Sequence, residues 1–392
     1  MRPLQGITVI ALEQALAAPL ATRHLADLGA RVIKVERPEV GDFARAYDTT
    51  VRGMASHFVW ANRSKESLTL DLKHEDAKQV LHRLLEKADV FVQNFAPGAC
   101  ERLGLGTAAL RSRYPRLIVC NLSGYGPSGP YRDKKAYDLL IQSETGLVSI
   151  TGTPENPSKV GISIADTAAA MYAFSGILTA LLMRKDTGQG TAIEVSLFEA
   201  LSEWMGYAAY YTEYGGSAPP REGARHAAIA PYGPFPTGDD KTIYLGIQNE
   251  REWRRFCEIV LEMPEIATDS RFVSNSKRVQ NREELEKIIT ATFRKLRTEI
   301  IIQRLEATPV AYARLNSMEE FLQHPQLAAR GRWQEIESPV GPLHALRPTP
   351  DMENVEPLMG AVPALGQHTE AILKELGFDA NKISEWKRKK II

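Results

Sequence analysis

Residues 7–36 read ITVIALEQALAAPLATRHLADLGARVIKVE, and this stretch decides the fold class. The apolar run at 7–12 predicts a strand, and the alanine-rich segment at about 18–28 predicts a helix. Gly29 ends that helix, and RVIKVE at 31–36 predicts a second strand. A strand, a helix and a second strand in this order form a βαβ unit, in which the two strands lie parallel. The sequence therefore predicts an α/β fold.

The alternation of strands and helices continues along the chain. Further strands are predicted at 68–72, 89–95, 116–126 and 192–197, and helices at 74–88, 166–184 and 198–214. After the loop at Gly215–Pro220 the pattern changes to a pair of strands around a GDD turn, followed by helices from about Glu250 to Leu322. This change predicts a smaller domain over residues 225–325. This smaller domain lies between an N-terminal part of the chain, residues 1–215, and a C-terminal part, residues 326–392.

The composition limits the classes of function. The 392 residues are 44% hydrophobic, which is enough to fill the cores of two domains. The 48 basic and 48 acidic residues balance, so no overall field attracts nucleic acid or an anionic membrane. The three cysteines, Cys100, Cys120 and Cys257, are too few and too scattered for a disulfide framework or a zinc site. We therefore expect a reduced, cytoplasmic protein without a metal.

Two segments bear on a membrane location. The N-terminal residues MRPLQGITVIALEQ contain no extended apolar region of the kind that a secretory signal needs. The stretch GISIADTAAAMYAFSGILTALLMR at 161–184 carries no charge between Asp166 and Arg184, and that interval is at the short end of the range for a membrane span. A buried helix in a large soluble core has the same pattern. We expect the buried helix and no membrane.

Several common catalytic signatures are missing. The first strand–helix turn, EQALAAPLA at 13–21, lacks the G-x-G-x-x-G glycines that let a pyrophosphate approach the backbone, so an NAD enzyme is not expected. The eight histidines form no H-E-x-x-H or similar pair, which leaves a metal hydrolase without support. The chain also has no G-x-S-x-G nucleophile elbow.

Three basic residues follow predicted strands. Arg37, Lys73 and Arg102 each lie at the carboxyl end of a strand or in the loop beyond it. Ligands of α/β sheets bind at this edge, and cations that converge there suit phosphate groups. Any one of them alone is more simply a surface residue. Their equivalent positions in successive units favour a site.

Asp166 stands at the start of the apolar stretch at 161–184 and has two interpretations. As an N-cap, an aspartate there stabilises a helix by about 1 kcal/mol. As a nucleophile, it would be kept anionic by the helix N-terminus, whose backbone N–H groups would also stabilise a developing oxyanion. The local residues favour the cap and leave the nucleophile open.

Seven blocks of sequence, in order, are similar to one known family. They are LGARVIKVERPEVGD at 28–42, ANRSKESLTLDLK at 61–73, ADVFVQNFAPGACERLG at 88–104, the GYG at 124–126 followed by AYDLLIQSETGL at 136–147, the segment with Asp166 at 161–184, RKDTGQGTAIEVSLFEAL at 184–201 and PALGQHTEAILKELGF at 363–378. Over essentially its whole length the sequence resembles the class III CoA-transferases, the family of formyl-CoA transferase and carnitine CoA-transferase. The resemblance implies a large Rossmann-like domain whose parallel sheet is built from both chain ends, a smaller α+β domain inserted between them, and an interlocked homodimer.

The resemblance also implies a mechanism and a set of contacts. Asp166 falls on the family's catalytic aspartate, which forms a mixed anhydride with the donor acyl group and then an aspartyl-CoA thioester. Coenzyme A is the co-substrate. The implied CoA contacts are Arg37, Leu70, Lys73, Asn94, Phe95, Arg102, Lys135 and Tyr137, with main-chain contacts near Ala15 and Leu16.

The substrate class follows from GIQNEREW at 246–253, which is similar to the branch that acts on short dicarboxylic acids such as mesaconate, citramalate, itaconate, malate and glutarate, often with succinyl-CoA as donor. The expected function is CoA transfer to a dicarboxylic acid of four to six carbons, or between the two carboxyl groups of one mesaconyl-CoA molecule. A second carboxylate needs cations or amide donors. The candidates are Arg52, Arg225, His226 and Gln248.

Two alternatives and one departure remain. A 2-methylacyl-CoA racemase of the same fold pairs its aspartate with a histidine, but no histidine lies between Asp133 and Gly146. A CoA-binding protein without catalysis would use Asp166 only as a cap. The family's formyl-CoA transferase branch covers its aspartate with a glycine run, which is absent from RHAAIAPYGPFPTG at 225–238. We expect the loop at Ala227–Tyr232 to shield the anhydride instead.

Overall fold

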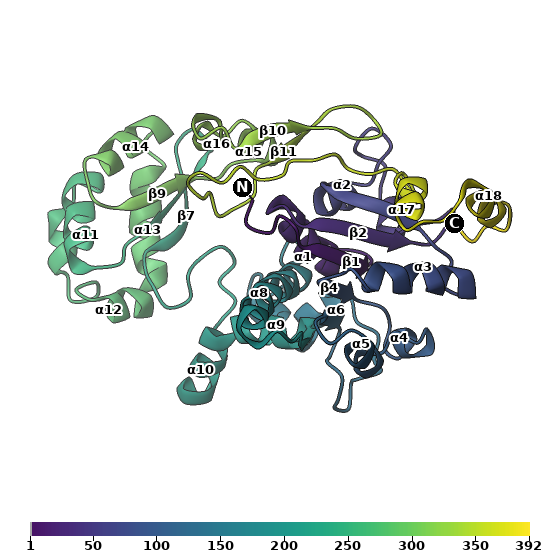
Figure 1. Ribbon diagram of the computed structural model, residues 1–392. Helices are drawn as coiled ribbons and strands as arrows, with labels where there is room; N and C mark the ends of the chain where they lie inside the picture. The colour runs from purple at the N-terminus through teal and green to yellow at the C-terminus, as the bar shows by residue number, and fades with distance from the viewer. Residues whose placement is uncertain (1) are drawn as a thin grey trace. The chain divides into compact units, whose positions relative to one another are not determined.

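The computed structural model describes residues 2–392, which divide into two compact units (Figure 1). The large unit consists of Met1–Gly146, Val160–Tyr207 and Gln326–Ile392, and the small unit consists of Leu147–Lys159 and Ala208–Pro325. Each unit has its own hydrophobic core.

The large unit is built on a parallel sheet. Within residues 2–392 its six strands are β1 (Thr8–Leu12), β2 (Arg31–Glu36), β3 (Lys65–Thr69), β4 (Val90–Gln93), β5 (Ile118–Ser123) and β6 (Ala192–Ser196). They lie in the order β3-β2-β1-β4-β5-β6, and every neighbouring pair is parallel. The predicted α/β fold is confirmed. The strand order reverses between β1 and β4, and such a reversal opens a crevice at the carboxyl ends of the two strands.

Helices flank this sheet on both faces (Figure 1). One face packs against α1 (Ala17–Asp27) and the long helix α8 (Ile164–Thr187). The opposite face forms a core with α3 (Glu75–Leu85) and with the C-terminal helices α17 (Thr369–Glu375) and α18 (Ala380–Arg388). Both faces are covered, so the central strands β1 and β4 are nearly continuous apolar runs. The remaining helices of the unit are η1 (Phe43–Ala46), α2 (Ser56–Asn62), α4 (Ala99–Arg102), α5 (Thr107–Arg113), α6 (Asp138–Glu144) and α9 (Leu197–Trp204).

Two predicted elements have different bounds. The strand expected at 68–72 is β3, at 65–69, because its residues pair with β2 and the chain turns after Leu70, where His74 N donates to Asp71 O. The helix expected at 198–214 is interrupted at Met205 and becomes α9 and α10 (Gly206–Gly215). The expectation of a single helix is therefore wrong, and the tyrosines of α10 are mostly exposed.

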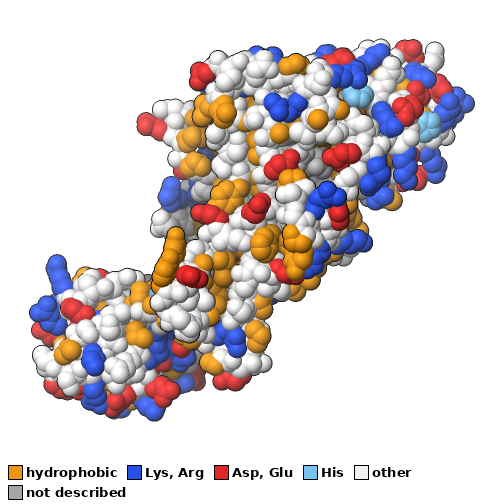
Figure 2. All heavy atoms as spheres, turned by 90° about the horizontal axis from the view of Figure 1, so that it is seen from below, with side chains coloured by type: hydrophobic (Ala, Val, Ile, Leu, Met, Phe, Trp, Pro, Cys, Tyr) orange, Lys and Arg blue, Asp and Glu red, His pale blue; other side chains and the backbone are white. Residues whose placement is uncertain are grey.

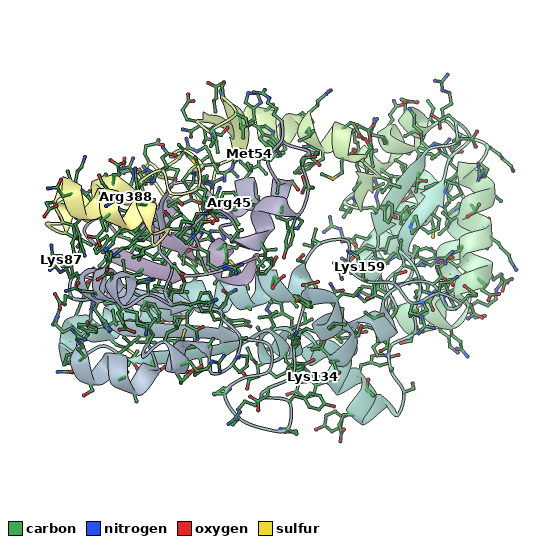
Figure 3. All side chains as sticks on the ribbon, turned by 90° about the vertical axis from the view of Figure 1, so that its right-hand side faces the viewer. Arg45, Met54, Lys87, Lys134, Lys159 and Arg388 are labelled. Carbon is green, nitrogen blue, oxygen red and sulfur yellow. The ribbon has the colours of Figure 1, made fainter. Side chains whose placement is uncertain are left out.

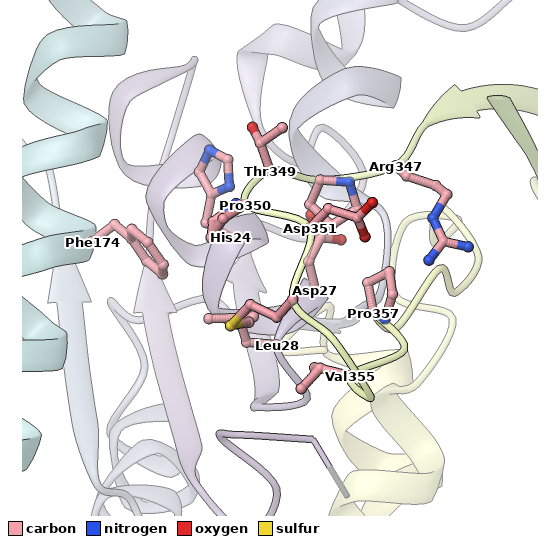
Figure 4. A pocket seen from close by; sticks show the side chains of 12 residues that line it. His24, Asp27, Leu28, Phe174, Arg347, Thr349, Pro350, Asp351, Val355 and Pro357 are labelled. Atoms are coloured by element: carbon pink, nitrogen blue, oxygen red, sulfur yellow. The ribbon is translucent and has the colours of Figure 1, made fainter. Parts of the chain in front are cut away.

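The expectation that both chain ends contribute strands to the parallel sheet is also wrong for residues 2–392. The C-terminal strands β10 (Trp333–Ile336) and β11 (Leu343–Leu346) pair antiparallel with each other and form a separate hairpin. The C-terminal part joins the large unit through its helices and through the segment at 347–357. Figure 4 shows side chains of that segment beside His24 and Asp27 of α1 and Phe174 of α8, around a cavity of about 20 Å³. A cavity of this size has room for a single water molecule.

The small unit holds a three-stranded antiparallel sheet within the described residues, with β8 (Thr242–Gly246) between β7 (Tyr232–Pro236) and β9 (Ala311–Arg314). Its core gathers around Phe235, Trp253 and Phe293. The helical segments are α7 (Leu147–Ile150), α11 (Glu250–Arg255), η2 (Phe256–Val260), η3 (Pro264–Thr268), α12 (Asn275–Gln280), α13 (Arg282–Phe293), α14 (Thr298–Glu306) and α15 (Met318–Leu322), and α16 (Pro325–Ala329) begins at its last residue.

The domain boundaries differ from the expected 1–215, 225–325 and 326–392. Residues 147–159 belong to the small unit, because Gly223 N donates to Gly152 O at 2.7 Å and Arg221 donates to the carbonyls of Ser149, Thr153 and Pro154. The second segment of the small unit begins at residue 208, whereas the sequence predicted 225. Sequence periodicity could not show this excursion, because it depends on contacts between distant segments.

Within the described residues, α8 is one helix with the length and composition to cross a membrane. A core helix passes the same test, and α8 packs against α1, α9, β5 and β6. Some of its apolar side chains stay exposed, such as Leu182 and Met183. Figure 2, which looks from the side where Figure 1 draws α8 and α9, shows hydrophobic side chains at the surface among charged ones.

Candidate functional site

A pocket of about 860 Å³ opens in the large unit at the carboxyl ends of the strands. Its walls come from the loops that follow β1, β2, β3, β4 and β5, and Asp166 at the start of α8 contributes to them. This is the edge where the reversal in strand order predicts a ligand. The volume is that of a site for a sizeable organic molecule.

The structure brings most of the predicted site residues together here. Asp166 and every predicted CoA contact except Leu16 line the pocket: Ala15, Arg37, Leu70, Lys73, Asn94, Phe95, Arg102, Lys135 and Tyr137. The side chain of Leu16 is buried in the core instead. The roles of these residues in binding stay predictions.

Four cations in the pocket have no partner within the described residues 2–392. Arg37, Lys73, Arg102 and Lys135 line it, and none of their side-chain nitrogens makes a hydrogen bond or an ion pair there. Lys134, labelled in Figure 3, also lines the pocket but pairs with Glu144. Unpaired cations around one hollow suit a polyanion such as the phosphates of CoA. Apolar side chains between them suit its uncharged parts.

The side-chain amide of Asn94 is already hydrogen-bonded to the backbone of another loop. Its Oδ1 accepts from Gln14 N at 2.9 Å and its Nδ2 donates to Gln14 O at 2.9 Å. The amide of Asn94 therefore fixes the loop after β1. The predicted contact with CoA needs the second lone pair of Oδ1 or the second hydrogen of Nδ2, which Gln14 does not use.

Asp166 is not the cap of its helix, so that expectation is wrong. The N-cap of α8 is Ser163, and Asp166 is the third residue of the first turn. The carboxylate that binds the helix N-terminus belongs to Asp138: its Oδ1 accepts from Ala165 N at 2.8 Å and from Asp166 N at 3.2 Å. Asp138 does the capping, and the carboxyl of Asp166 is left for another role.

The expected oxyanion hole at this helix N-terminus is also wrong. The N–H groups of Ala165 and Asp166 donate to Asp138, and Ile164 N and Thr167 N donate to the carbonyls of Ile162 and Ser163. These groups have acceptors already and cannot serve a developing negative charge without losing them.

The environment of Asp166 disfavours its charged form. Burial, and then the nearby carboxylate of Asp138, raise the pKa of Asp166 to about 7. The prediction that the helix keeps this group anionic is therefore reversed, because burial outweighs the helix N-terminus. At neutral pH a substantial share of the carboxyl is protonated. Its ionised form is more basic than an ordinary aspartate, which favours nucleophilic attack.

Asp138 is held in place by α6 and by the segment before α8. Its Oδ2 accepts from Gln142 Nε2 at 2.6 Å, and Gln142 Oε1 accepts from Val160 N at 2.9 Å. Gln142 thus holds the acidic neighbour of Asp166 and is itself held by the backbone before α8.

The substitution Asp138→Asn is expected to lower the pKa of Asp166 by about one unit, because the like charge is removed while burial, the larger cause, stays. The amide oxygen of asparagine can still accept from Ala165 N. The acid limb of kcat/KM against pH then moves to lower pH, as titration of the free enzyme over pH 5.5–8.5 measures. The control is Asp133→Asn, an exposed acid that lines the same pocket. An identical profile for Asp138→Asn and the parent would contradict this coupling.

Sequence reasoning missed several residues of the pocket. Tyr47 lines it, and burial together with the carboxylates of Asp42 and Asp166 raises the pKa of the Tyr47 hydroxyl to about 12. Phe43 and Gln14 line it as well. No spacing signal marks these residues, because they meet through contacts between the loop after β1 and the loop after β2, which lie far apart in the sequence.

The predicted substrate contacts lie elsewhere in the described chain. Arg52, in the large unit, is absent from the pocket lining and donates to Pro342 O at 3.2 Å. In the small unit Arg225 pairs with Glu286 at 2.9 Å, the ring of His226 stacks on Tyr232, and Gln248 N donates to Glu252. All of the pocket's lining residues belong to the large unit. The four candidates stay predictions.

The loop expected to shield the intermediate is braced within the small unit. Arg282 Nη2 donates to the carbonyls of His226, Ala227 and Ile229. Asn275 donates to Ala228 O at 2.9 Å and accepts from Ala230 N at 3.1 Å. The loop thus has a defined shape without glycine, and its shielding role stays a prediction.

Two absences within the described residues limit the chemistry. No group of three or more His, Cys, Asp or Glu side chains there could hold a metal ion. The pocket lining, which lies entirely within residues 2–392, also includes no histidine. Asp166 is therefore without an imidazole partner on the pocket walls.

Comparison with known proteins gives consistent matches over the whole chain. A family model described as CoA-transferase family III matches residues 4–369. A succinyl-CoA:glutarate CoA-transferase of Homo sapiens is 34% identical, covering 98% of this chain and 89% of that protein. A succinate–glutarate CoA-transferase of Agrobacterium fabrum is 35% identical, covering 95% and 96%. The crystal structure of a CAIB/BAIF family protein from Brucella suis has a TM-score of 0.84 at 32% identity and covers 96% of this chain and 99% of that chain.

Proposed function

Because this chain belongs to CoA-transferase family III and is a CoA-transferase with acyl-CoA as co-substrate, we propose that it moves CoA between succinyl-CoA and a short dicarboxylic acid such as glutarate. The names of the two glutarate relatives support the substrate class. The observation that carries the proposal is one pocket with four unpaired cations and a single aspartate of raised pKa.

Asp166 is the proposed nucleophile. Its carboxylate oxygen attacks the thioester carbonyl of the donor, the C–S bond breaks, and CoA leaves as the thiolate, which gives a mixed anhydride. The thiolate then attacks the Asp166 carbonyl of the anhydride and releases the donor acid as a carboxylate. The acceptor carboxylate repeats these two steps in reverse, so CoA ends on the acceptor and Asp166 is free again. No net proton is consumed.

The raised pKa of Asp166 fits this chemistry. Each step needs the ionised carboxylate or its acyl derivative, and an ionised group of pKa about 7 is a better nucleophile than an ordinary aspartate. Once acylated, the side chain is uncharged, and the cost of holding a buried charge beside Asp138 disappears. Formation of the anhydride is favoured by the same burial that raises the pKa.

Three further expectations belong to this proposal. The enzyme is a homodimer with interlocked protomers, for which the exposed apolar side chains Leu182, Met183 and Trp204 give support. It works in a reducing cytoplasm, in keeping with three buried cysteines without disulfides. Transfer between the two carboxyl groups of one mesaconyl-CoA molecule is the alternative form of the reaction.

A panel of donors and acceptors tests the substrate class. Succinyl-CoA is incubated with glutarate, mesaconate, itaconate, citramalate and malate, and with the monocarboxylates acetate and butyrate, and new CoA esters are followed by mass spectrometry. The expected result is transfer to at least one dicarboxylate and little to the monocarboxylates. Transfer confined to monocarboxylates overturns the substrate class, and deuterium exchange at an α-carbon without transfer supports the racemase.

A further inference from the structure

One buried carboxylate joins two loops of the pocket. Asp42 follows β2 and is fully buried. Its Oδ1 accepts from Ala15 N, in the loop after β1, at 3.1 Å, and from Ala44 N, in the loop after β2, at 2.9 Å. Gln14 and Ala15 on one loop and Phe43 and Tyr47 on the other line the pocket. This oxygen atom joins the two walls by two hydrogen bonds, and Phe43 N adds a longer bond to Gln14 Oε1 at 3.4 Å.

The conformation of Ala15 depends on this bond. Its φ of 62° lies in the left-handed region, which residues other than glycine rarely adopt. The bond from Ala15 N to Asp42, together with the bonds between Gln14 and Asn94, holds the segment in this conformation. A non-glycine residue near a site keeps a left-handed backbone conformation only where the surrounding contacts hold it there.

Lys34 neutralises Asp42 from inside the core. Its Nζ lies 2.8 Å from Asp42 Oδ2 and 3.4 Å from Glu13 Oε1, and the lysine is completely buried. Burial alone would favour loss of the proton, but the carboxylates of Glu13, Asp42 and Glu36 outweigh it and raise the pKa of Lys34. The lysine stays charged, and the buried carboxylate of Asp42 has its countercharge.

A second buried lysine offers an internal comparison. Lys65 Nζ binds Glu13 Oε1 at 2.7 Å, Pro19 O at 2.8 Å and Asn62 Oδ1 at 3.0 Å. It shares Glu13 with Lys34, but its ammonium group makes no hydrogen bond to Asp42. Both lysines are equally buried, and only Lys34 reaches Asp42.

We propose that Asp42 and Lys34 are positioning residues for the transfer reaction. Asp42 fixes the walls that carry Gln14 and Tyr47 relative to each other, and Lys34 holds Asp42 in the orientation that accepts both backbone N–H groups. The pair acts on the end of the pocket near Asp166, where the acyl group reacts in the proposed mechanism. Tyr47 lies at this end, and the charge of Asp166 contributes to the raised pKa of its hydroxyl. The cations Lys73, Arg102 and Lys135 lie on other loops, so CoA binding does not depend on Asp42 and Lys34. This inference rests on the proposed function.

Two double variants test the proposal as a matched pair. Lys34→Met with Asp42→Asn removes both charges and keeps an oxygen that accepts from Ala15 N and Ala44 N. Lys34→Met with Asp42→Leu removes the same charges at similar volume and has no acceptor. The expected kcat falls by about threefold for the first and about 30-fold for the second, because a small misplacement of reacting groups has a large effect on rate. The Kd for CoA, from calorimetric titration, stays within about threefold of the parent in both.

Lys65→Met is the control for loss of a buried lysine. It is expected to lower the melting temperature while kcat stays within about threefold of the parent. If the leucine variant does not fold, Lys34→Met alone is compared with Lys65→Met, and the addition of Asp42→Asn should restore most of the kcat that Lys34→Met loses. Equal kcat for the asparagine and leucine variants overturns the proposal, and so does a kcat loss for Lys65→Met as large as that for Lys34→Met.

These assays use the donor and acceptor that the substrate panel identifies. If the enzyme prefers a monocarboxylate, the dicarboxylate assignment fails, and the comparison of variants still decides the role of Asp42. If the dicarboxylate assignment holds and the matched pair shows no difference, only the positioning role fails.

Discussion

The substitution Asp166→Asn is expected to abolish CoA transfer, with kcat lower by at least about 10⁴-fold. The amide keeps the shape of the side chain but has no carboxylate oxygen to attack a thioester. The Kd for CoA, measured by calorimetric titration, should stay close to that of the parent, because the unpaired cations of the pocket are unchanged. Wild-type turnover in this variant would end the proposed mechanism.

The covalent intermediate provides a second readout for the same residue. When the parent enzyme is incubated with succinyl-CoA and then with hydroxylamine or borohydride, intact mass should show a modification that peptide mapping places on Asp166. Asp166→Asn treated in the same way is the control and should give the unmodified mass. A modification at another residue, or none with an active parent, contradicts the assignment.

Asp166→Asn is also expected to stabilise the protein above neutral pH. Burial and Asp138 raise the pKa of Asp166 from 3.8 to about 7, so the contribution of its protonated form to stability is complete below about pH 4 and is lost as the pH rises through about 7. Asparagine does not titrate. The gain in free energy of unfolding for Asp166→Asn should therefore grow between pH 4 and pH 8 by at most about 4 kcal/mol, as denaturant titrations measure. A pH-independent difference would contradict the raised pKa.

Removing two pocket cations together, Arg37→Gln with Arg102→Gln, is expected to weaken CoA binding by about 10³-fold, because each removes a charge-assisted contact to phosphate. The kcat at saturating acyl-CoA should fall far less, since neither residue touches the reacting carbonyl in the proposed mechanism. Calorimetric titration gives the Kd, and its dependence on salt should become weaker than in the parent.

Lys134→Gln is the matched control for this double variant. Lys134 lines the same pocket, but its ammonium group pairs with Glu144. Its replacement should change the Kd for CoA by no more than about threefold. A similar Kd for the parent and the double variant would show that the unpaired cations of the pocket serve another ligand.

The sequence predicted the fold and one edge of the site from local patterns. The βαβ unit at 7–36 is a strong signal because both strands contain short apolar runs and the helix between them is alanine-rich and almost entirely buried. Arg37, Lys73 and Arg102 could be placed near one another because the carboxyl ends of parallel strands meet at one edge. The resemblance to the CoA-transferases then favoured the nucleophile for Asp166 and added further pocket residues: Leu70, Asn94, Phe95, Lys135 and Tyr137.

Other features of the site could not be predicted, because they depend on contacts between segments far apart in the sequence. Asp138 reaches the helix that carries Asp166, so the cap and the raised pKa follow from tertiary packing rather than from the residues beside Asp166. Asp42 reaches Ala15 in the same way. The side chain of Leu16 is buried, and the main-chain contact with CoA that the resemblance implies near Ala15 and Leu16 stays a prediction.

The division of the chain between the two units has a consequence for synthesis in the cell. Ile372 and Trp386, which belong to the same apolar core as α3, follow the small unit along the chain and therefore leave the ribosome after it. Until they emerge, the nascent chain presents this uncovered surface for the whole time that the small unit is being translated. Such a chain depends on chaperones to prevent premature association, and a stop codon that removes only the last two helices should yield aggregates rather than a smaller working enzyme.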